Sequence, residues 1–122
     1  MVEFISFGIR RLAEGASLPE CDFYVDARRV FAYNPHRYFR RSDGRSRSVQ
    51  EWLLDHPRRP DSIEVAFGEC VEAYQSLGAP FRVGVFCSWG VHRSVGLAEI
   101  LARRFEFVPD ASPCVRHLDL QY

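Results

Sequence analysis

Short apolar runs, rich in β-branched and aromatic residues, alternate with polar segments along this 122-residue chain. An apolar run of four to eight residues is typical of a strand in a buried sheet. The pattern therefore predicts strands at residues 2–7, 22–26, 81–87 and 115–120.

Apolar residues between these runs recur at helical spacing. One stripe with spacings of three and four residues predicts a core-facing helix that ends at Gly78, and it consists of Ile63, Phe67, Cys70, Tyr74 and Leu77. A second helix is predicted over residues 93–105, with Leu97, Leu101 and Phe105 facing inward. Two pairs have the spacing of a capping box and predict helix starts, namely Ser48 with Glu51 and Asp61 with Glu64.

The order of these elements predicts the fold class. Strands and helices alternate, and the connections are long enough to join parallel strands. The apolar fraction of 47% is sufficient for one core. We therefore expect a single α/β domain over residues 1–122, with a mixed, mostly parallel sheet, helices on its faces and a strand–anion loop–helix unit at residues 81–105.

The basic residues are unevenly distributed, although 16 of them balance 16 acidic ones. All are arginines, and residues 28–59 contain nine of them against three acidic residues, a local charge of +6. No periodicity persists over residues 27–47, which we expect to form a long structured loop. Because arginines alternate with aromatic residues here, the segment is a candidate RNA-binding surface through Arg37, Arg40, Arg41, Arg45 and Arg47. The alternative is an arginine-rich surface loop, balanced by the acidic helix of Glu64, Glu69 and Glu72.

Cysteine spacing and hydropathy exclude further classes of protein. The four cysteines lack the C-x-x-C spacing of zinc sites, so we expect free thiols, no metal and no other cofactor. No apolar run reaches the roughly 18 residues of a membrane span, and the chain opens directly into a predicted strand. We therefore expect a cytoplasmic protein without a membrane segment.

The segment CSWGVHRS at residues 87–94 carries most of the chemical information, because it joins the third strand to a helix. Amides at a helix N-terminus, and the helix dipole, favour an anion at that point. Gly90 permits close backbone approach, Arg93 can bind an anion with two hydrogen bonds, and the Ser94 hydroxyl adds a donor. The segment predicts a phosphate or sulfate site; the alternative is an ordinary strand–helix turn with a solvated arginine.

Two family resemblances compete for this loop. The spacing C-x5-R-S is similar to the phosphate loop of protein tyrosine phosphatases, which implies Cys87 as nucleophile, Arg93 as phosphate clamp and Ser94 as partner of the thiolate. Phe86 stands where most of these phosphatases have histidine, and no aspartate lies on an obvious general-acid loop.

The second resemblance covers nearly the whole chain. The segments SFG at residues 6–8, YVDAR at 24–28 and NPH at 34–36 resemble, in order, motifs of the C-terminal domain of the RNase adapter protein RapZ. The loop at residues 87–94, LAE at 97–99 and VRHLDL at 115–120 continue the match. The N-terminal kinase-like domain of RapZ and its basic tail have no counterpart in this chain.

The resemblance to RapZ implies a regulatory domain that senses glucosamine-6-phosphate and binds small RNA, without hydrolytic chemistry. The implied ligand contacts in the loop are Ser88, Trp89, Gly90, His92, Arg93 and Ser94. Those implied elsewhere are Asp26, Arg28, Asn34, His36, Arg116 and His117. Trp89 replaces a family glycine and would narrow or cap the pocket.

Two of these residues have more than one interpretation. His92 either donates a hydrogen bond to an anion or is a surface histidine at a helix start, and Asp26 either accepts a hydrogen bond from a ligand hydroxyl or orients Arg28.

For the chain as a whole we expect a sugar-phosphate sensor with an RNA or protein partner. A small phosphatase that uses Cys87 is the alternative, and an RNA-binding module with an inorganic anion in the loop is a third hypothesis.

Overall fold

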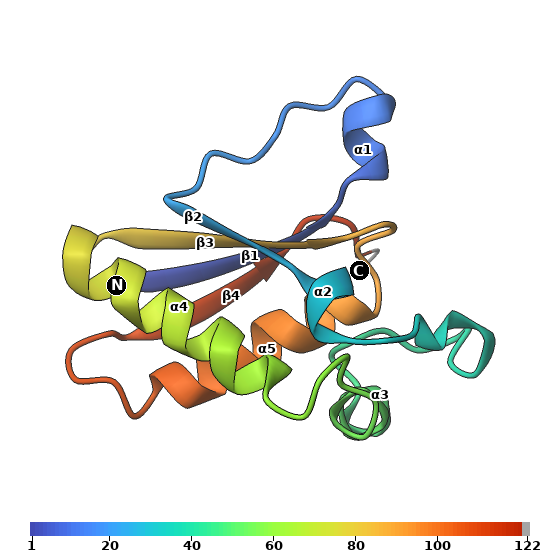
Figure 1. Ribbon diagram of the computed structural model, residues 1–122. Coiled ribbons are helices and arrows are strands. Elements are labelled where there is room, and N and C mark those ends of the chain that lie inside the picture. Colours follow the sequence, from blue (N-terminus) through green and yellow to red (C-terminus); the bar gives the residue numbers. More distant parts are fainter. Residues whose placement is uncertain (121–122) are drawn as a thin grey trace.

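The computed structural model describes residues 1–120 and is built on a four-stranded parallel sheet (Figure 1). The strands lie in the order β2-β3-β1-β4 and comprise β1 (Val2–Gly8), β2 (Phe23–Asp26), β3 (Phe81–Cys87) and β4 (Pro113–His117). The central strand β1 pairs with β3 from Val2↔Phe81 to Gly8↔Cys87. Because the strands run in one direction, the carboxyl ends of β1, β2 and β3 meet at one edge of the sheet, where open α/β sheets bind ligands.

The helices are α1 (Arg10–Ala13), α2 (Ala27–Val30), the 3₁₀ helix η1 (Pro35–Arg37), α3 (Arg47–Leu54), α4 (Ser62–Leu77) and α5 (Arg93–Phe105). Figure 1 shows the two longest, α4 and α5, on the same face of the sheet, whereas the short α1 lies on the other. The predicted α/β domain is confirmed, with all strands parallel.

The core lies between the sheet and α5. Leu97, Leu101 and Phe105 are fully buried, as the helical spacing predicts, and the ring of Phe105 meets that of Phe4 edge-to-face at 5.2 Å. Burial of each such side chain contributes about 1.5–3 kcal/mol relative to exposure. This packing holds α5 against the sheet, and the segment at residues 87–94, here called the anion loop, joins β3 to the start of α5.

Helix α4 follows its predicted stripe except at one end. Ile63 and Cys70 are buried, and Phe67 and Tyr74 pack against the core from half-buried positions. The prediction for Leu77 is wrong, because its side chain is 61% exposed. It occupies the last turn of the helix, where the chain leaves α4 toward β3.

Neither capping box forms. Helix α3 begins at Arg47, two residues earlier than the Ser48 box implies, and the preceding Ser46 makes no side-chain cap. Asp61 does precede α4, but its side chain makes no cap hydrogen bond. Its backbone angles, φ −101° and ψ 7°, differ from the extended conformation of a capping residue. The Ser62 hydroxyl instead accepts the N–H of Arg59 at 2.8 Å.

Three segments depart from the predicted boundaries. The segment expected as a loop before residue 19 contains α1, and the long segment at residues 27–47 contains α2 and η1. The strand predicted at residues 115–120 is observed at Pro113–His117. Proline is tolerated at its start because β4 is an edge strand. The strand ends early because the Asp119 carboxylate turns toward the N–H of Gly8.

Candidate anion-binding site

The residues after β3 form a tight loop around the thiol of Cys87. The Gly90 N–H donates to the Cys87 sulfur across 3.2 Å, and the Cys87 thiol donates to the Ser94 hydroxyl across 3.1 Å. Gly90 has a φ of +77°, and a Cβ at this position would lie 2.5 Å from the amide nitrogen of Gly8. The shape of the loop therefore depends on glycine and on the end of β1 beside it.

Asp119, which follows β4, contacts the end of β1 and lies beside Gly90 of the same loop. The Asp119 carboxylate accepts the Gly8 N–H at 2.7 Å and lies 3.4 Å from the Arg11 guanidinium. A Cβ on Gly90 would lie 2.9 Å from Asp119 Oδ2. Three segments that are distant in sequence thus meet at Gly8, Gly90 and Asp119.

Arg93, the first residue of α5, carries an unused donor. Its Nε atom is buried and has no hydrogen-bond partner within residues 1–120, a property that it shares with Arg11 Nε. Burial lowers the pKa of Arg93, the nearby Cys87 sulfur raises it, and the nearby Arg28 lowers it further. A buried donor without an acceptor is costly, and a bound anion would supply the acceptor.

Arg28 is held beside this position by Asp26, at the end of β2. The guanidinium donates from Nε and NH2 to the two carboxylate oxygens, each at 2.9 Å, and the Arg28 N–H donates to Oδ1 at 3.0 Å. Burial raises the pKa of Asp26, but the hydrogen bonds from Arg28 outweigh it and leave the pKa below its ordinary value. Asp26 therefore orients Arg28 and caps the following turn, which was one of the two alternatives for this residue.

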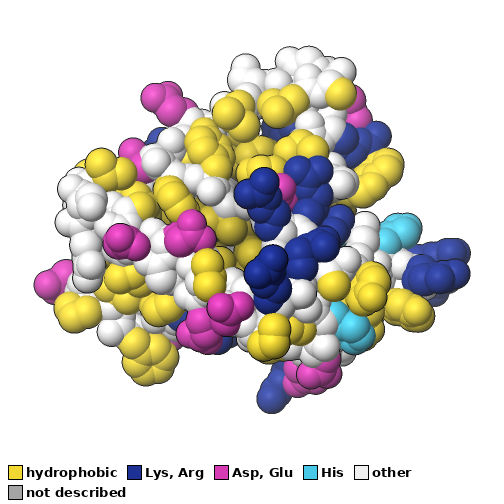
Figure 2. Space-filling view, viewed as in Figure 1, with side chains coloured by type: hydrophobic (Ala, Val, Ile, Leu, Met, Phe, Trp, Pro, Cys, Tyr) yellow, Lys and Arg dark blue, Asp and Glu magenta, His cyan; other side chains and the backbone are white. Residues whose placement is uncertain are grey.

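Arg58 completes a group of three arginines with Arg28 and Arg93. Its guanidinium donates to the Arg28 carbonyl oxygen at 3.0 and 3.1 Å, and its charge is near enough to Arg93 to lower the pKa of that residue. Figure 2 shows basic side chains gathered around α2 on this face of the molecule. Such a group attracts small anions.

His92 faces the long segment before α3, not the open side of the loop. Its ring is buried, and Nε2 lies 2.9 Å from the Phe39 carbonyl oxygen and 2.7 Å from that of Ser42. Because both neighbours are acceptors, Nε2 carries the proton. His36 is exposed, with its ring 5.7 Å from that of His92, and the Asn34 side chain accepts the N–H of His36 at 3.1 Å.

The structure does not bring the two candidates of β4 to the loop. Arg116 is exposed, and its Nε lies 3.4 Å from Glu3, near the amino end of β1 and five residues before Gly8. His117 is buried on the side of α5, where its ring joins the Ser6 hydroxyl at 2.6 Å to the Glu99 carboxylate at 2.9 Å. Ligand contact by either residue stays a prediction.

A sequence model of the RapZ C-terminal domain matches residues 1–121. The chain belongs to the RapZ C-terminal domain family. The sequence resemblance is thereby confirmed, and its motifs correspond in order to β1, β2, η1, the anion loop, α5 and β4.

Curated relatives agree with this family. A protein of Rubrobacter xylanophilus named a nucleotide-binding protein is 37% identical, over 98% of this chain and 40% of its own length. Nucleotide-binding proteins of Corynebacterium efficiens and Gluconacetobacter diazotrophicus are 32% and 33% identical, over 94% and 85% of this chain. The chain spans about two fifths of the first relative, and 37% and 31% of the other two.

Within this RapZ C-terminal domain, Trp89 stands at the mouth of the loop. Its side chain is 55% exposed, and the Arg10 guanidinium lies 3.7 Å from its ring centroid. The Arg10 N–H donates to the Ser88 carbonyl oxygen at 3.3 Å. Trp89 therefore covers the loop on the side of α1, paired with an arginine that the sequence analysis did not select.

The candidate RNA-binding arginines are all exposed, but several have partners. Arg45 binds the Asp43 carboxylate, Arg47 lies 3.0 Å from Glu51, and Arg37 lies over the ring of Tyr38 at 6.0 Å. Burial raises the pKa of Asp43, while the hydrogen bonds from Arg45 lower it to a net value below normal.

Sequence reasoning missed Arg10, Arg11, Arg58 and Asp119. No local motif contains the three arginines, because they reach the site only through the sheet topology. Asp119 does lie in the closing motif of the family, and that signal could have identified it.

No helix within residues 1–120 is long and apolar enough to cross a membrane. In the same part of the chain, no group of three or more His, Cys, Asp or Glu residues is arranged to hold a metal ion.

Proposed function

We propose that this RapZ C-terminal domain is a cytoplasmic regulatory sensor that binds a sugar phosphate similar to glucosamine-6-phosphate at the loop of residues 87–94. The single observation that carries the proposal is the buried Arg93 Nε, which has no acceptor within residues 1–120 and lies beside Arg28 and Arg58. A phosphate accepts several hydrogen bonds at once, so it matches such a group of planar guanidinium donors.

The position of the loop supports the same assignment. It precedes the 13-residue helix α5 at the carboxyl end of a parallel strand, where helix N–H groups and the dipole favour negative charge. The sugar end of the ligand is assigned to the side of η1, because the exposed His36 is in ring contact with His92, the residue before Arg93. Asn34 belongs to the same turn.

Binding without hydrolysis fits the cysteine better than catalysis does. Cys87 is 3% exposed, so its sulfur lies inside the loop and is not open to a substrate. A nucleophile must reach phosphorus as an accessible thiolate. Hydrolysis of p-nitrophenyl phosphate that is lost in Cys87→Ser would contradict the sensor and favour a phosphatase.

A thermal-melt titration with glucosamine-6-phosphate tests the proposal, with glucosamine and inorganic phosphate as controls. At about 100 times its dissociation constant the ligand adds about 2.7 kcal/mol of stability. For a domain of this size, that corresponds to a shift of roughly 10 °C. Equal shifts with inorganic phosphate would contradict the sugar assignment, and no shift with any compound would contradict the site.

Substitution of Arg93 links binding to the loop. We expect Arg93→Ala to weaken binding by about 2–3 kcal/mol, because a charge-assisted contact with two hydrogen bonds is lost. Arg93→Lys keeps the charge but not the planar fork, so it should restore only part of the affinity. Arg82→Ala, at an exposed arginine near the amino ends of the strands, is the matched control and should bind normally. Full affinity in Arg93→Ala would place the site elsewhere.

RNA binding is the second candidate function, and exposed aromatic residues favour it. Tyr33 and Tyr38 are 63% and 65% exposed on the segment that also carries Arg37, Arg40 and Arg41. Exposed rings stack on unpaired bases, and arginines bind the phosphates between them. The two proposed surfaces meet at η1, which carries both His36 and Arg37, so substitutions at Arg40 and Arg41, outside η1, are the ones that separate the two functions.

A further inference from the structure

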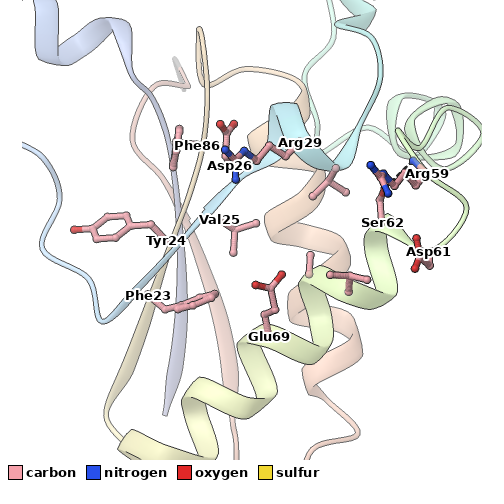
Figure 3. A pocket seen from close by; sticks show the side chains of 13 residues that line it. Phe23, Tyr24, Val25, Asp26, Arg29, Arg59, Asp61, Ser62, Glu69 and Phe86 are labelled. Atoms are coloured by element: carbon pink, nitrogen blue, oxygen red, sulfur yellow. Dashed lines mark hydrogen bonds between the residues drawn. The ribbon is translucent and has the colours of Figure 1, made fainter.

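A groove runs along the outer edge of the sheet, between β2 and α4. Its main hollow has a volume of about 530 Å³ and is lined by all four residues of β2 and by one face of α4 (Figure 3). A second hollow of about 270 Å³ shares Phe23 and Glu69 with it and continues to Ser76. The groove therefore follows α4 from Ser62 to Ser76, about 21 Å at 1.5 Å per residue. Six residues of extended chain cover that distance.

The backbone of β2 borders this groove. Figure 3 shows the Tyr24 side chain directed away from Glu69, although Tyr24 belongs to the lining. Within residues 1–120, β2 pairs only with β3, so its other edge has no strand beside it. The opposite edge strand, β4, begins with Pro113, a residue that discourages further pairing. The β2 sequence FYVD contains no proline or basic residue, which are residue types that keep edge strands from pairing with another chain.

The groove has an apolar floor, both basic and acidic side chains near the carboxyl end of β2, and acidic side chains farther along α4. Phe23, Val25 and Ala66 contribute to the floor, and Val65 on α4 is 50% exposed beside them. Arg29 and Arg59 line the end near the carboxyl end of β2, together with Asp61 and with the Asp26 carboxylate that Arg28 binds. Glu69 lies midway along the groove, where the two hollows meet, and Glu72 lies farther toward Ser76.

We propose that this groove binds an extended peptide segment of a protein partner, added to the sheet beside β2. The segment places alternate apolar side chains on the floor, a basic side chain at Glu69 and Glu72, and an acidic side chain at Arg29 and Arg59. The added strand forms main-chain hydrogen bonds with the unpaired N–H and C=O groups of β2. The pockets and charges of the groove determine which peptide sequence binds. Arg93 does not line the groove, whereas Asp26 borders both the groove and the anion site.

The test uses labelled six-residue peptides of alternating valine and threonine, with lysine at one end and glutamate at the other, in both orders. Fluorescence polarisation should show saturable binding of one order, and amide shifts of the labelled protein should concentrate at Phe23–Asp26. A peptide methylated on alternate backbone nitrogens should not bind, because it cannot pair with the strand. Equal binding by the methylated peptide would overturn strand addition.

Charge reversal gives the decisive comparison. The double variant Glu69→Arg and Glu72→Arg should bind the original peptide at least tenfold more weakly, and it should prefer a peptide whose lysine is replaced by glutamate. Gln75→Arg adds one positive charge to α4 outside the groove, against a change of four in the double variant, and should bind as wild type does. Recovery with the exchanged peptide shows that the double variant is folded.

Three results would reject the peptide partner. They are absence of binding by wild type, equal affinity of the charge-reversed variant for both peptides, and a wild-type dimer in sedimentation that the double variant abolishes. The last result would mean that a second copy of this chain occupies the groove.

Discussion

At position 90, the absence of a side chain decides whether the anion loop can form. Gly90 combines a left-handed backbone with an approach to Gly8 and Asp119 that leaves no room for a Cβ. Its N–H also donates a hydrogen bond to the Cys87 sulfur. One small residue thus supports both the turn and the contact between the loop and β1.

We expect Gly90→Ala to destabilise the domain by about 2–4 kcal/mol, since positive φ and overlap with backbone atoms both add cost. Gly68→Ala is the matched control, because Gly68 lies within α4 with open space around its Cα. That variant should be more stable by up to about 1 kcal/mol. Urea unfolding measures both, and equal effects would contradict the account of Gly90.

The pair of Asp26 and Arg28 predicts a pH dependence. The pKa of Asp26 is lower in the folded chain than its ordinary value of about 3.9, because Arg28 hydrogen-bonds the charged form. Its contribution to stability is complete above that ordinary value and is lost as the pH falls through the folded pKa. Asp26→Asn should therefore make the stability less sensitive to pH below about 4. An unchanged profile in urea unfolding between pH 2 and pH 6 would contradict this role.

Residue chemistry was predictable where the partners are close in sequence. Gly90, Arg93 and Ser94 belong to one loop, so their spacing alone indicated an anion site. The surroundings of Arg93 were not predictable, because Arg28 and Arg58 come from other segments and meet it only in the folded chain. His92 likewise has a buried ring whose carbonyl partners lie about 50 residues away.

Among the elements, β4 joins the layers of the domain. His117 bridges Ser6 on β1 and Glu99 on α5, and Asp119 beyond the strand holds Gly8. Removal of the imidazole would leave the buried Ser6 hydroxyl without this partner and would open a small cavity. The edge strand therefore stabilises the same end of β1 on which the anion loop rests.

We predict that His117→Ala lowers the free energy of unfolding by about 2–4 kcal/mol, from the lost hydrogen bonds and the cavity. Arg116→Ala, one residue earlier, removes an exposed side chain and should change it by less than about 1 kcal/mol. Guanidinium unfolding of both variants provides the measurement. Similar losses of unfolding free energy in the two variants would contradict a stabilising role for the hydrogen bonds of His117 with Ser6 and Glu99.

The elements themselves were predicted best where apolar periodicity extends over several turns or a whole strand. Helix α5 and strand β3 have their predicted bounds, because buried positions recur along their full length. The capping boxes were predicted wrongly, since capping depends on the backbone angles of one residue, which the spacing of Asp61 and Glu64 does not determine. The end of β4 depends on Asp119, a contact with a strand more than 100 residues away.

At the scale of the whole molecule, a neutral chain has a separated charge distribution. Residues 28–59 carry +6, and acidic residues such as Glu69 and Glu72 lie on α4. The field around the domain therefore attracts anions to one region although the total charge is zero. This separation makes RNA binding testable through its response to salt.

If the segment at residues 37–47 binds single-stranded RNA, affinity should fall steeply as salt increases. The double variant Arg40→Ala and Arg41→Ala should bind more weakly and reduce the salt slope by about 1.4, at about 0.7 per lost phosphate contact. Arg93→Ala should leave the slope unchanged if the anion loop is a separate site. Filter binding at several salt concentrations measures the slopes, and salt-independent binding would reject the surface.

The central position of β1 also determines when this domain can fold. Within this domain β1 precedes the other strands in sequence, yet both of its neighbours, β3 and β4, come from the last third of the domain. Such a topology has a high contact order, which slows folding. On the ribosome, β1 must remain without its neighbours until residues 81–117 have emerged, so the sheet forms only after the last strand of the domain has been made. The nascent N-terminal half, with two apolar strands uncovered, is then the stage at which this protein most needs chaperone protection.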